Sequence, residues 1–369
     1  MKKNILLIRF GKMSNLPPAL AILDSFVGSD DYELTVLSSE YDQEIDDIYS
    51  KKGVRFIHCY DRILSKNSIW RKFQILWYDY VFRKYVRRVL KEKEYDYKWI
   101  LHEETTVRVS GLVKPPFIMT TYELNDKRPF LTRRLIPMAR KATVNVVCEY
   151  NRAHIMKAQY GLRELPLVVP NKPVVHPRKK NVPSNTVVDD INDKIVLYQG
   201  QMYSNERNLE ALCEAVSEMQ GFKLVLMGSR NYYTEMLCKK YPSVLHVDYI
   251  KAPYHLSVTS HAYIGFVSYS SDSLNTMYCA PNKIWEYSGF GVPMIANKIP
   301  GLKYTVEVNG AGKCVDTDSV KELQNAIREI DSNYARYSNN ALSFYESCDV
   351  RSLLLNVIDC YNKKLCEDR

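Results

Sequence analysis

Short apolar runs that alternate with longer helical segments constrain the fold of this chain most strongly. In the first half the runs are β-branched and aliphatic, and they lie at residues 4–8, 34–38, 54–58, 99–102, 117–121 and 144–148. Continuous apolar strands are typical of a parallel sheet with helices on both faces, because each crossover helix covers one side of the sheet. The first half therefore predicts a doubly wound, Rossmann-like α/β domain.

A second series of strands follows a stretch of different composition. Residues 166–194 are rich in proline, asparagine and charge and lack a sustained helical period, which indicates an interdomain linker. After this linker we predict a second doubly wound domain. Its strands are expected at 194–200, 222–228, 244–250, 263–269 and 292–297, with helices at 208–219, 233–240 and 283–290. From Val320 onward we predict helix.

The length of 369 residues agrees with two domains, since a single hydrophobic core seldom supports so long a chain. We expect residues 1–170 to form the first domain and residues 171–349 the second. The last helix, residues 350–369, is expected to return to the first domain. The two Rossmann-like domains are expected to face each other across a cleft.

Hydropathy and cysteine usage indicate a cytoplasmic protein. No uncharged apolar run reaches the roughly 18 to 20 residues that a transmembrane helix needs. Arg9 interrupts the apolar stretch at the N-terminus, so MKKNILLIRFGKM predicts a first strand rather than a signal peptide. The 9 cysteines are dispersed without a C-x-x-C pair, which favours neither zinc nor disulfides and fits a reducing compartment.

The positive charge of the chain lies in its first half. Residues 1–170 hold 29 of the 51 Lys and Arg residues but only 20 of the 42 Asp and Glu residues, so the net charge of +9 belongs to this half. The basic residues concentrate at 62–98 and 127–141. We therefore expect an anionic partner for the first domain. Nucleic acid is not expected, because no DNA- or RNA-binding motif accompanies the charge.

The basic stretch from Trp70 to Lys93 also carries aromatic residues at helical spacing. Two interpretations are open: a helix at the surface of an anionic membrane, or a helix whose aromatic stripe faces the core while its cations are solvated. On the first, the chain is peripheral on the inner face of the cell membrane. The aromatic side comprises Trp70, Phe73 and Trp77, and the basic side comprises Lys84, Arg87, Arg88 and Lys91.

Two segments of the second half have features of a phosphate-binding site. In YQGQMYSNERNLEAL, Gly200 ends a strand and Arg207 precedes a helix start, where backbone N–H groups and a guanidinium can bind a diphosphate. In CAPNKIWEYSGFG, Pro281 and Asn282 open a helix and Lys283 lies in its first turn, where the helix dipole disfavours a lysine unless an anion is present. Glu286, one turn on, can accept from two vicinal hydroxyls. The alternatives are a turn glycine with a surface arginine, and a solvated amphipathic helix.

The segment NKIWEYSGFGVPMIA resembles the donor site of GT-B glycosyltransferases of family 4, or group 1. The blocks YQG, RNLE, VLMGS, HVDYI and GLKYTVEVNGAGKCV follow that family's order over roughly residues 194–316. The resemblance implies a nucleotide-sugar as substrate, with a UDP-sugar favoured, and neither a cofactor nor a metal ion. The implied donor contacts are Glu286 on the ribose, Asn282 and Lys283 beside the diphosphate, Arg207 opposite them, and Tyr249 and Ile250 near the base.

The chain departs from the family pattern at two places. Tyr278 stands eight residues before Glu286, where relatives have a glutamate that approaches the transferred sugar. The first loop, FGKMSNLPP, carries only Gly11 where relatives often have two glycines on the acceptor side. The sugar and the stereochemical outcome are therefore left open.

Residues that follow two predicted strands of the first half are candidates for the acceptor side. His102 and Glu103 follow one strand, and Glu123 follows the next after Tyr122. Such an imidazole or carboxylate can position or deprotonate an acceptor hydroxyl, so we take His102, Glu103 and Glu123 as catalytic candidates. The alternative is that they make ordinary loop contacts.

The favoured hypothesis is a glycosyltransferase that adds a sugar to a lipid-linked or polysaccharide acceptor in surface-glycan biosynthesis. A sugar-nucleotide epimerase of the same fold would use the same donor pocket without an acceptor. A non-catalytic glycosyltransferase-like subunit is a third hypothesis, supported by Tyr278 in place of the usual acidic residue.

Overall fold

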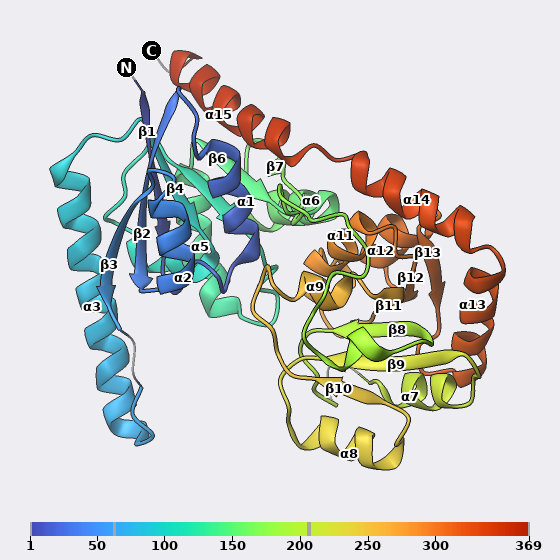
Figure 1. The fold of residues 1–369 in the computed structure, drawn as a ribbon. Helices are drawn as coiled ribbons and strands as arrows, with labels where there is room; N and C mark the ends of the chain where they lie inside the picture. The colour runs from blue at the N-terminus through green and yellow to red at the C-terminus, as the bar shows by residue number, and fades with distance from the viewer. Residues whose placement is uncertain (1, 62–63, 205–207, 368–369) are drawn as a thin grey trace. The chain divides into compact units, whose positions relative to one another are not determined.

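The computed structural model describes residues 2–61, 64–204 and 208–367. The chain divides into two compact units (Figure 1). The first unit comprises Met1–Pro170 and Val350–Arg369, and the second comprises Asn171–Asp349. Each unit is built on one parallel sheet.

The sheet of the first unit has seven strands in the order β3-β2-β1-β4-β5-β6-β7. The order reverses between β1 and β4, which are both paired in parallel. The strands are β1 (Lys3–Arg9), β2 (Tyr32–Glu40), β3 (Arg55–Tyr60), β4 (Tyr97–Leu101), β5 (Ile118–Thr121), β6 (Val144–Val147) and β7 (Leu167–Val168).

Helices cover both faces of this first sheet because side chains on its strands are buried on both sides. On one face, Phe82 of α3 packs in the core with Leu6 and Ile8 of β1. On the other face, Trp99 of β4 lies 6.3 Å from Phe26 of α1, measured between ring centroids. The helices are α1 (Pro17–Phe26), α2 (Gln43–Ser50), α3 (Ser68–Glu92), α4 (Glu103–Val109), α5 (Pro129–Lys141), α6 (Tyr150–Tyr160) and α15 (Val350–Glu367).

The second unit repeats the plan with six parallel strands in the order β10-β9-β8-β11-β12-β13, which reverses between β8 and β11. Its strands are β8 (Lys194–Gln199), β9 (Phe222–Met227), β10 (Leu245–Val247), β11 (Ala262–Val267), β12 (Met294–Asn297) and β13 (Gly312–Val315). Alternate strand residues enter two separate cores, one packed by α9, α11 and α14 and the other by α7, α8 and α13.

The helical segments of the second unit are short between strands and longer toward the C-terminus. They are η1 (Val187–Asp190), α7 (Glu210–Ser217), α8 (Tyr232–Lys240), α9 (Leu256–Thr259), α10 (Leu274–Met277), α11 (Asn282–Gly289), α12 (Pro300–Leu302), η2 (Lys303–Glu307), α13 (Val320–Ser332) and α14 (Tyr334–Glu346). The predicted α/β class with two doubly wound sheets is therefore confirmed.

The stretch predicted to be a linker is more structured than its composition indicates. Leu167 and Val168 form β7 and pair with β6, and Val187–Asp190 form a short helical turn. Lys172 is buried, and its ammonium group donates to the carbonyls of Tyr345 (2.6 Å) and Cys348 (2.5 Å). A prediction from local period misses such contacts because they join residues far apart in the sequence.

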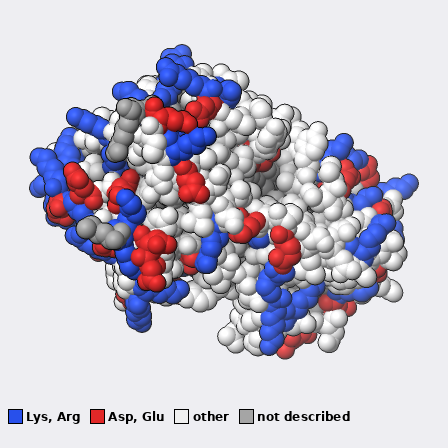
Figure 2. Space-filling model, turned by 90° about the horizontal axis from the view of Figure 1, so that it is seen from above, with Lys and Arg blue, Asp and Glu red and all other residues white. Residues whose placement is uncertain are grey.

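The aromatic residues of α3 are exposed, so the core-facing interpretation of this stripe is wrong. Trp70, Phe73 and Trp77 are 65%, 62% and 54% exposed, whereas the helix packs through Tyr78, Phe82, Val86 and Val89. Charge elsewhere is more mixed: on the face shown in Figure 2, Lys and Arg lie among Asp and Glu. None of the helices in the described part of the chain combines the length and apolar composition needed to cross a membrane.

Candidate functional site

Each sheet has one switch point, where neighbouring strands connect in opposite directions. In an open parallel sheet the loops diverge beyond the carboxyl ends of such strands and leave a crevice for ligands. In the first unit the switch point lies between β1 and β4, and in the second between β8 and β11.

Gly200 follows β8 at the switch point of the second unit, in a conformation that favours glycine. Its φ is +133°, and its N–H donates to the carbonyl of Met227 at 2.9 Å. The neighbouring backbone is close, since a Cβ added to Gly228 would lie 2.2 Å from the Gly200 carbonyl oxygen. The two glycines therefore allow a tight backbone edge that a ligand can approach closely.

The side chain of Lys283 lies beside Gly200, although 83 positions separate the two residues in the sequence. Its Nζ lies 3.1 Å from the position of a Cβ on Gly200, and 4.6 Å from the ring centroid of Tyr198. Lys283 is buried in the first turn of α11, directly after the partly buried Asn282. A cation at a helix N-terminus opposes the helix dipole, and a bound diphosphate would neutralise both.

Glu286 lies one turn further along α11, and its carboxylate is buried and hydrogen-bonded. Gln199, at the end of β8, donates to Oε2 of Glu286, and Nε2 of His255 lies 3.1 Å from Oε1. Thr259 in turn donates to the side-chain oxygen of Gln199 at 2.8 Å. A carboxylate accepts about four hydrogen bonds, so Glu286 can still accept from a ligand.

Glu286 and His255 favour each other's charged form despite burial. Burial by itself would raise the pKa of Glu286, but the combined effect of His255, Lys283 and His176 outweighs burial, and the pKa is lowered. Burial would lower the pKa of His255, but Glu286 outweighs it and the pKa is raised. Sequence reasoning missed His255, because it lies in the loop after β10 without a recognisable motif. It became apparent only through its contact with α11.

The remaining donor-side predictions are less closely gathered. Tyr249 follows β10 and is 63% exposed, while Ile250 beside it packs against the core that contains α11. Arg207 lies outside the described residues. Tyr278, the residue at the departure from the family pattern, caps the C-terminus of α10. Within the described ranges, no three His, Cys, Asp or Glu side chains gather as a metal-binding group.

Glu103 begins α4 in the first unit and holds the loop after β5. It is 1% exposed, and its Oε1 accepts from the backbone N–H groups of Tyr122 (2.5 Å) and Glu123 (2.7 Å). Burial raises the pKa of Glu103 against the opposing effect of these hydrogen bonds. Its geometry is that of a residue that positions the loop rather than one that contacts an acceptor.

Glu123 is the more accessible carboxylate at this edge. Its side chain is 51% exposed, and it lies 3.7 Å from Nη1 of the buried Arg152. Arg152 also donates to the carbonyl of Tyr122. Sequence reasoning missed Arg152, which lies in α6 and reaches the loop only through the fold.

His102 joins β4 to α4 in a strained backbone conformation. Its φ is +78°, and its Nδ1 accepts from the N–H of Glu104 at 3.3 Å. Burial, followed by the charge of Arg9, lowers the pKa of His102 to about 4, so the imidazole is neutral near pH 7. Gly11, the acceptor-loop prediction, has φ +113° and donates its N–H to Ser39 Oγ at 2.7 Å.

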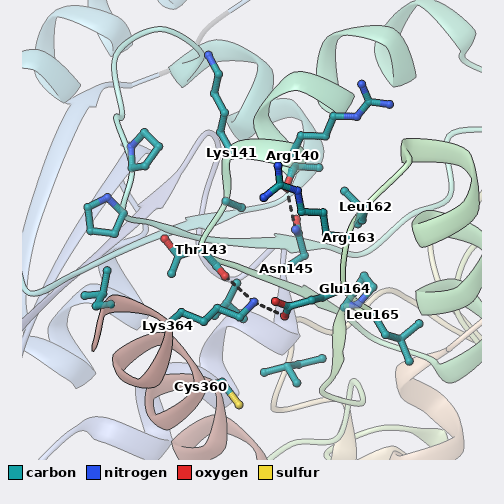
Figure 3. A pocket seen from close by; sticks show the side chains of 18 of the residues that line it. Arg140, Lys141, Thr143, Asn145, Leu162, Arg163, Glu164, Leu165, Cys360 and Lys364 are labelled. Atoms are coloured by element: carbon teal, nitrogen blue, oxygen red, sulfur yellow. Dashed lines mark hydrogen bonds and ion pairs between the residues drawn. The ribbon is translucent and has the colours of Figure 1, made fainter. Parts of the chain in front are cut away.

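A cavity of about 790 Å³ lies at the amino ends of β5 and β6 in the first sheet, opposite the carboxyl ends where the candidate residues lie (Figure 3). Several of its polar side chains bind one another or the backbone. Lys364 of α15 donates to the carbonyl of Thr143 at 2.9 Å and pairs with Glu164 at 2.5 Å. Arg140 donates to the carbonyl of Tyr160 at 2.7 Å. The candidate site residues therefore lie away from this cavity.

Comparison with known proteins agrees with the features of both units. Residues 193–333 match the family model described as glycosyl transferases group 1. Sucrose-phosphate synthase from Thermosynechococcus elongatus is 14% identical with a TM-score of 0.75, over 99% of this chain and 100% of that one. Anabaena HepE in complex with UDP and glucose is 14% identical with a TM-score of 0.72, over 98% and 100%.

A third solved structure, the lipopolysaccharide outer core galactosyltransferase WaaB, is 14% identical with a TM-score of 0.62, over 96% of this chain and 99% of that one. No curated protein sequence matches this chain. The predicted resemblance to group 1 transferases and the predicted GT-B fold are thus confirmed.

Proposed function

We propose that this chain, a group 1 glycosyltransferase with the GT-B fold, transfers a sugar from a UDP-sugar in its second unit to an acceptor hydroxyl in its first. One observation carries the proposal: Gly200, Lys283 and Glu286, predicted as donor contacts from separate segments, lie together at the β8 and β11 switch point. UDP is favoured because the relatives HepE and S. aureus MnaA are described with bound UDP.

On the donor side, each group has a role that its chemistry suits. The ammonium group of Lys283 and the N–H groups at the start of α11 bind the diphosphate, with Asn282 beside them. Glu286 accepts from the ribose hydroxyls, and Gln199 and His255 hold its carboxylate in place. As the sugar leaves, charge develops on the diphosphate, and Lys283 stabilises it without rearrangement.

Tyr249 and Ile250, in the segment that leads from β10 to His255, are proposed to lie beside the base. Arg207 is proposed as a second cation on the diphosphate, on the family resemblance alone. Together these contacts would cover the donor from its base to its diphosphate.

On the acceptor side, Glu123 is proposed to accept the hydrogen bond of the attacking hydroxyl. Its carboxylate is the accessible one, and the buried Arg152 fixes its direction. Glu103 positions the Glu123 backbone, and His102 lines the same edge as a neutral imidazole. General base assistance of this kind usually contributes a factor of about 100 to 10,000 to the rate.

The acceptor is proposed to be lipid-linked or part of a polysaccharide at the inner face of the cell membrane. The support is α3, where an exposed apolar stripe lies beside basic residues. Such a helix can place its rings among lipid headgroups while its cations meet anionic lipids. The stripe comprises Ile69, Trp70, Phe73, Leu76, Trp77 and Tyr80, all more than half exposed, and Arg71 and Lys72 lie among them.

Donor binding is tested by thermal-shift measurements with UDP, GDP and their sugars. A ligand that binds only the folded protein raises the melting temperature by mass action. We expect UDP and one UDP-sugar to stabilise the wild type and to stabilise Glu286→Ala much less. Glu235→Ala, which changes an exposed carboxylate on α8, is the control. The proposal fails if no nucleotide or nucleotide-sugar stabilises the wild type.

Membrane binding is tested by vesicle flotation of the full chain. We expect flotation with vesicles of phosphatidylglycerol and phosphatidylcholine, and little with phosphatidylcholine alone. Replacing Trp70, Phe73 and Trp77 by alanine should abolish it, whereas Tyr232→Ala, at an 85% exposed aromatic residue of the second unit, should not. Equal flotation of both variants would contradict the role of α3.

The epimerase alternative is separated by product analysis. An epimerase converts its nucleotide-sugar when no acceptor is present, whereas a transferase leaves it unchanged or hydrolyses it slowly. Incubation of the stabilising UDP-sugar with the chain alone, followed by chromatography of the sugar, therefore decides between the two activities.

A further inference from the structure

We propose that Arg9, at the carboxyl end of β1, binds an anionic group of the acceptor, either a phosphate or a carboxylate. This rests on the proposed transfer reaction and adds the chemical class of its acceptor. Arg9 was not among the predicted site residues, although it ends the first strand of the chain.

Arg9 is a buried cation with unused donors. Arg9 is only 8% exposed. Its Nε and Nη1 atoms are buried and have no hydrogen-bond partner among the described residues. A guanidinium has five N–H donors in a planar fork that suits phosphate and carboxylate oxygens. Leaving such donors unpaired away from water is costly, so their presence at a sheet edge indicates a missing partner.

The carboxylates around Arg9 do not supply that partner. Glu103, Glu104 and Glu40 favour the charged guanidinium from a distance, but burial still lowers the pKa of Arg9. No carboxylate in the described part of the chain lies within 4.0 Å of it. Among these carboxylates Glu103 has the largest electrostatic effect on Arg9. Its Oε1 already accepts hydrogen bonds from two backbone N–H groups. Glu103 therefore offsets part of the charge and leaves the directional donors free for a ligand.

The position of Arg9 is that of a ligand contact. It ends β1 at the switch point, paired in register with Leu101 of β4, so that His102 follows on the neighbouring strand. The next residue, Phe10, is fixed by a hydrogen bond from its N–H to Thr105 Oγ1 at 2.9 Å. Gly11 then turns the chain with φ +113°, and a Cβ there would lie 3.6 Å from Nη2 of Arg9. The guanidinium is thus held between two strand ends.

The anion is assigned to the acceptor because the site lies in the first unit. The diphosphate contacts proposed for the donor, Lys283 and the start of α11, belong to the second unit. The whole net positive charge of the chain also lies in residues 1–170, which favours an anionic ligand there. The competing view is that Arg9 serves only as a distant counter-ion of Glu103.

The test measures anion binding by the full chain with the donor site filled. The protein is saturated with UDP, and sodium phosphate or sodium glucuronate is titrated against sodium chloride at constant ionic strength. Binding is followed by the shift in melting temperature. Arg9→Gln removes the guanidinium, Arg9→Lys keeps the charge without the fork, and Lys12→Gln removes an exposed charge from the same loop as the control.

We expect phosphate or glucuronate to bind the wild type and Lys12→Gln equally, and Arg9→Gln at least tenfold more weakly, with Arg9→Lys between them. A phosphate-selective result identifies a phosphorylated acceptor, and a glucuronate-selective result identifies an acidic sugar. Anion binding that is equal in wild type, Arg9→Gln and Arg9→Lys, or absent from all, would overturn the inference.

The UDP titration separates this inference from the proposed function. If UDP fails to bind the wild type, the proposed function fails. If UDP binds every variant equally but no anion depends on Arg9, only the inference fails. A circular dichroism spectrum and a single cooperative melting transition like those of the wild type show that Arg9→Gln is folded, and Arg9→Lys repeats the test if Arg9→Gln is not.

Discussion

The two switch points each contain a buried glutamate, yet the two carboxylates are held in opposite ways. In the first unit Glu103 is bound by backbone N–H groups, and burial raises its pKa. In the second unit Glu286 is bound by the side chains of Gln199 and His255, and its pKa is lowered. The first carboxylate supports a loop, whereas the second is kept charged at an edge where a ligand can bind.

The charged groups that remain show the same difference. At the second switch point Lys283 and Glu286 lie on one helix, so cation and anion are placed together for a ligand that carries both phosphate and hydroxyl groups. At the first, Arg9 has buried donors without partners while Glu123 faces outward. In the proposed function, the edge in the second unit binds the nucleotide and the edge in the first unit binds the acceptor.

The largest effect is expected for Glu123→Gln, because it removes the proposed base of the reaction. We expect kcat to fall by a factor of about 100 to 10,000, the usual range for this form of catalysis. UDP affinity should be unchanged, since Glu123 belongs to the first unit. Steady-state assays of UDP release and calorimetric titration of UDP measure the two quantities.

The control for this variant is Glu104→Gln. Glu104 is a neighbouring carboxylate that pairs with Arg108 at 3.6 Å on the surface of α4. If both variants lose the same activity, the effect reflects charge at this edge rather than a base at Glu123.

Glu103→Ala is expected to destabilise the fold more than any other change at either edge. It leaves the N–H groups of Tyr122 and Glu123 without their acceptor, and an unsatisfied buried group costs about 1–3 kcal/mol. We expect the free energy of unfolding in urea to fall by more than about 2 kcal/mol. Glu103→Gln keeps an acceptor oxygen and should lose much less, so equal losses in both variants would contradict the positioning role.

Glu286→Gln is expected to weaken UDP binding by a factor of about ten to one hundred. The reason is that hydrogen bonds to a charged group contribute about 1.5–3 kcal/mol, and the amide lacks both the charge and one acceptor. Calorimetric titration of UDP measures the loss. Glu235→Gln, on the surface of α8, should bind like the wild type. Undiminished affinity in Glu286→Gln would remove Glu286 from the donor site.

Much of the fold was predictable because the aliphatic runs are long and regular. Residues 4–8 and 194–200 predicted β1 and β8 to within about a residue or two, as expected for boundaries read from sequence. β7 and β13 were missed, since β7 has two residues and β13 contains glycine and lysine. The period of α3 predicted a helix correctly, but a period alone does not reveal whether a partner covers the apolar side.

The site was predictable where chemistry follows from a position along the chain. A glycine at a strand end and a lysine at a helix start pointed to Gly200 and Lys283, because both features are local. Arg9, His255 and Arg152 were missed, because their significance comes from residues far along the chain. The Glu286 and His255 contact, for example, joins α11 to the start of α9. The functional roles of all these residues remain predictions.

The smallest effect is expected from the pH dependence of the His255 and Glu286 pair. The pKa of His255 is raised, so its charged form stabilises the fold fully below its ordinary value of 6.5 and less as pH rises through the folded value. The pKa of Glu286 is lowered, so its contribution is present above 4.5 and is lost as pH falls through the folded value. The pair therefore stabilises the protein most between about pH 4.5 and 6.5.

His255→Gln removes the charge but keeps a donor toward Glu286. We expect its free energy of unfolding to fall below that of the wild type by on the order of 1 kcal/mol inside this window, and by less at pH 8. Urea titrations of both proteins from pH 4.5 to 8 give the difference between their free energies of unfolding. Contributions of titratable groups that the two proteins share cancel in this difference. Burial lowers the pKa of the neighbouring His176 to about 4, so His176 is neutral in the upper part of this pH range. A difference that is constant with pH would show that His255 acts as a neutral donor. The carboxylates of Glu103 and Glu286 would then differ in their hydrogen-bond partners rather than in a charged neighbour.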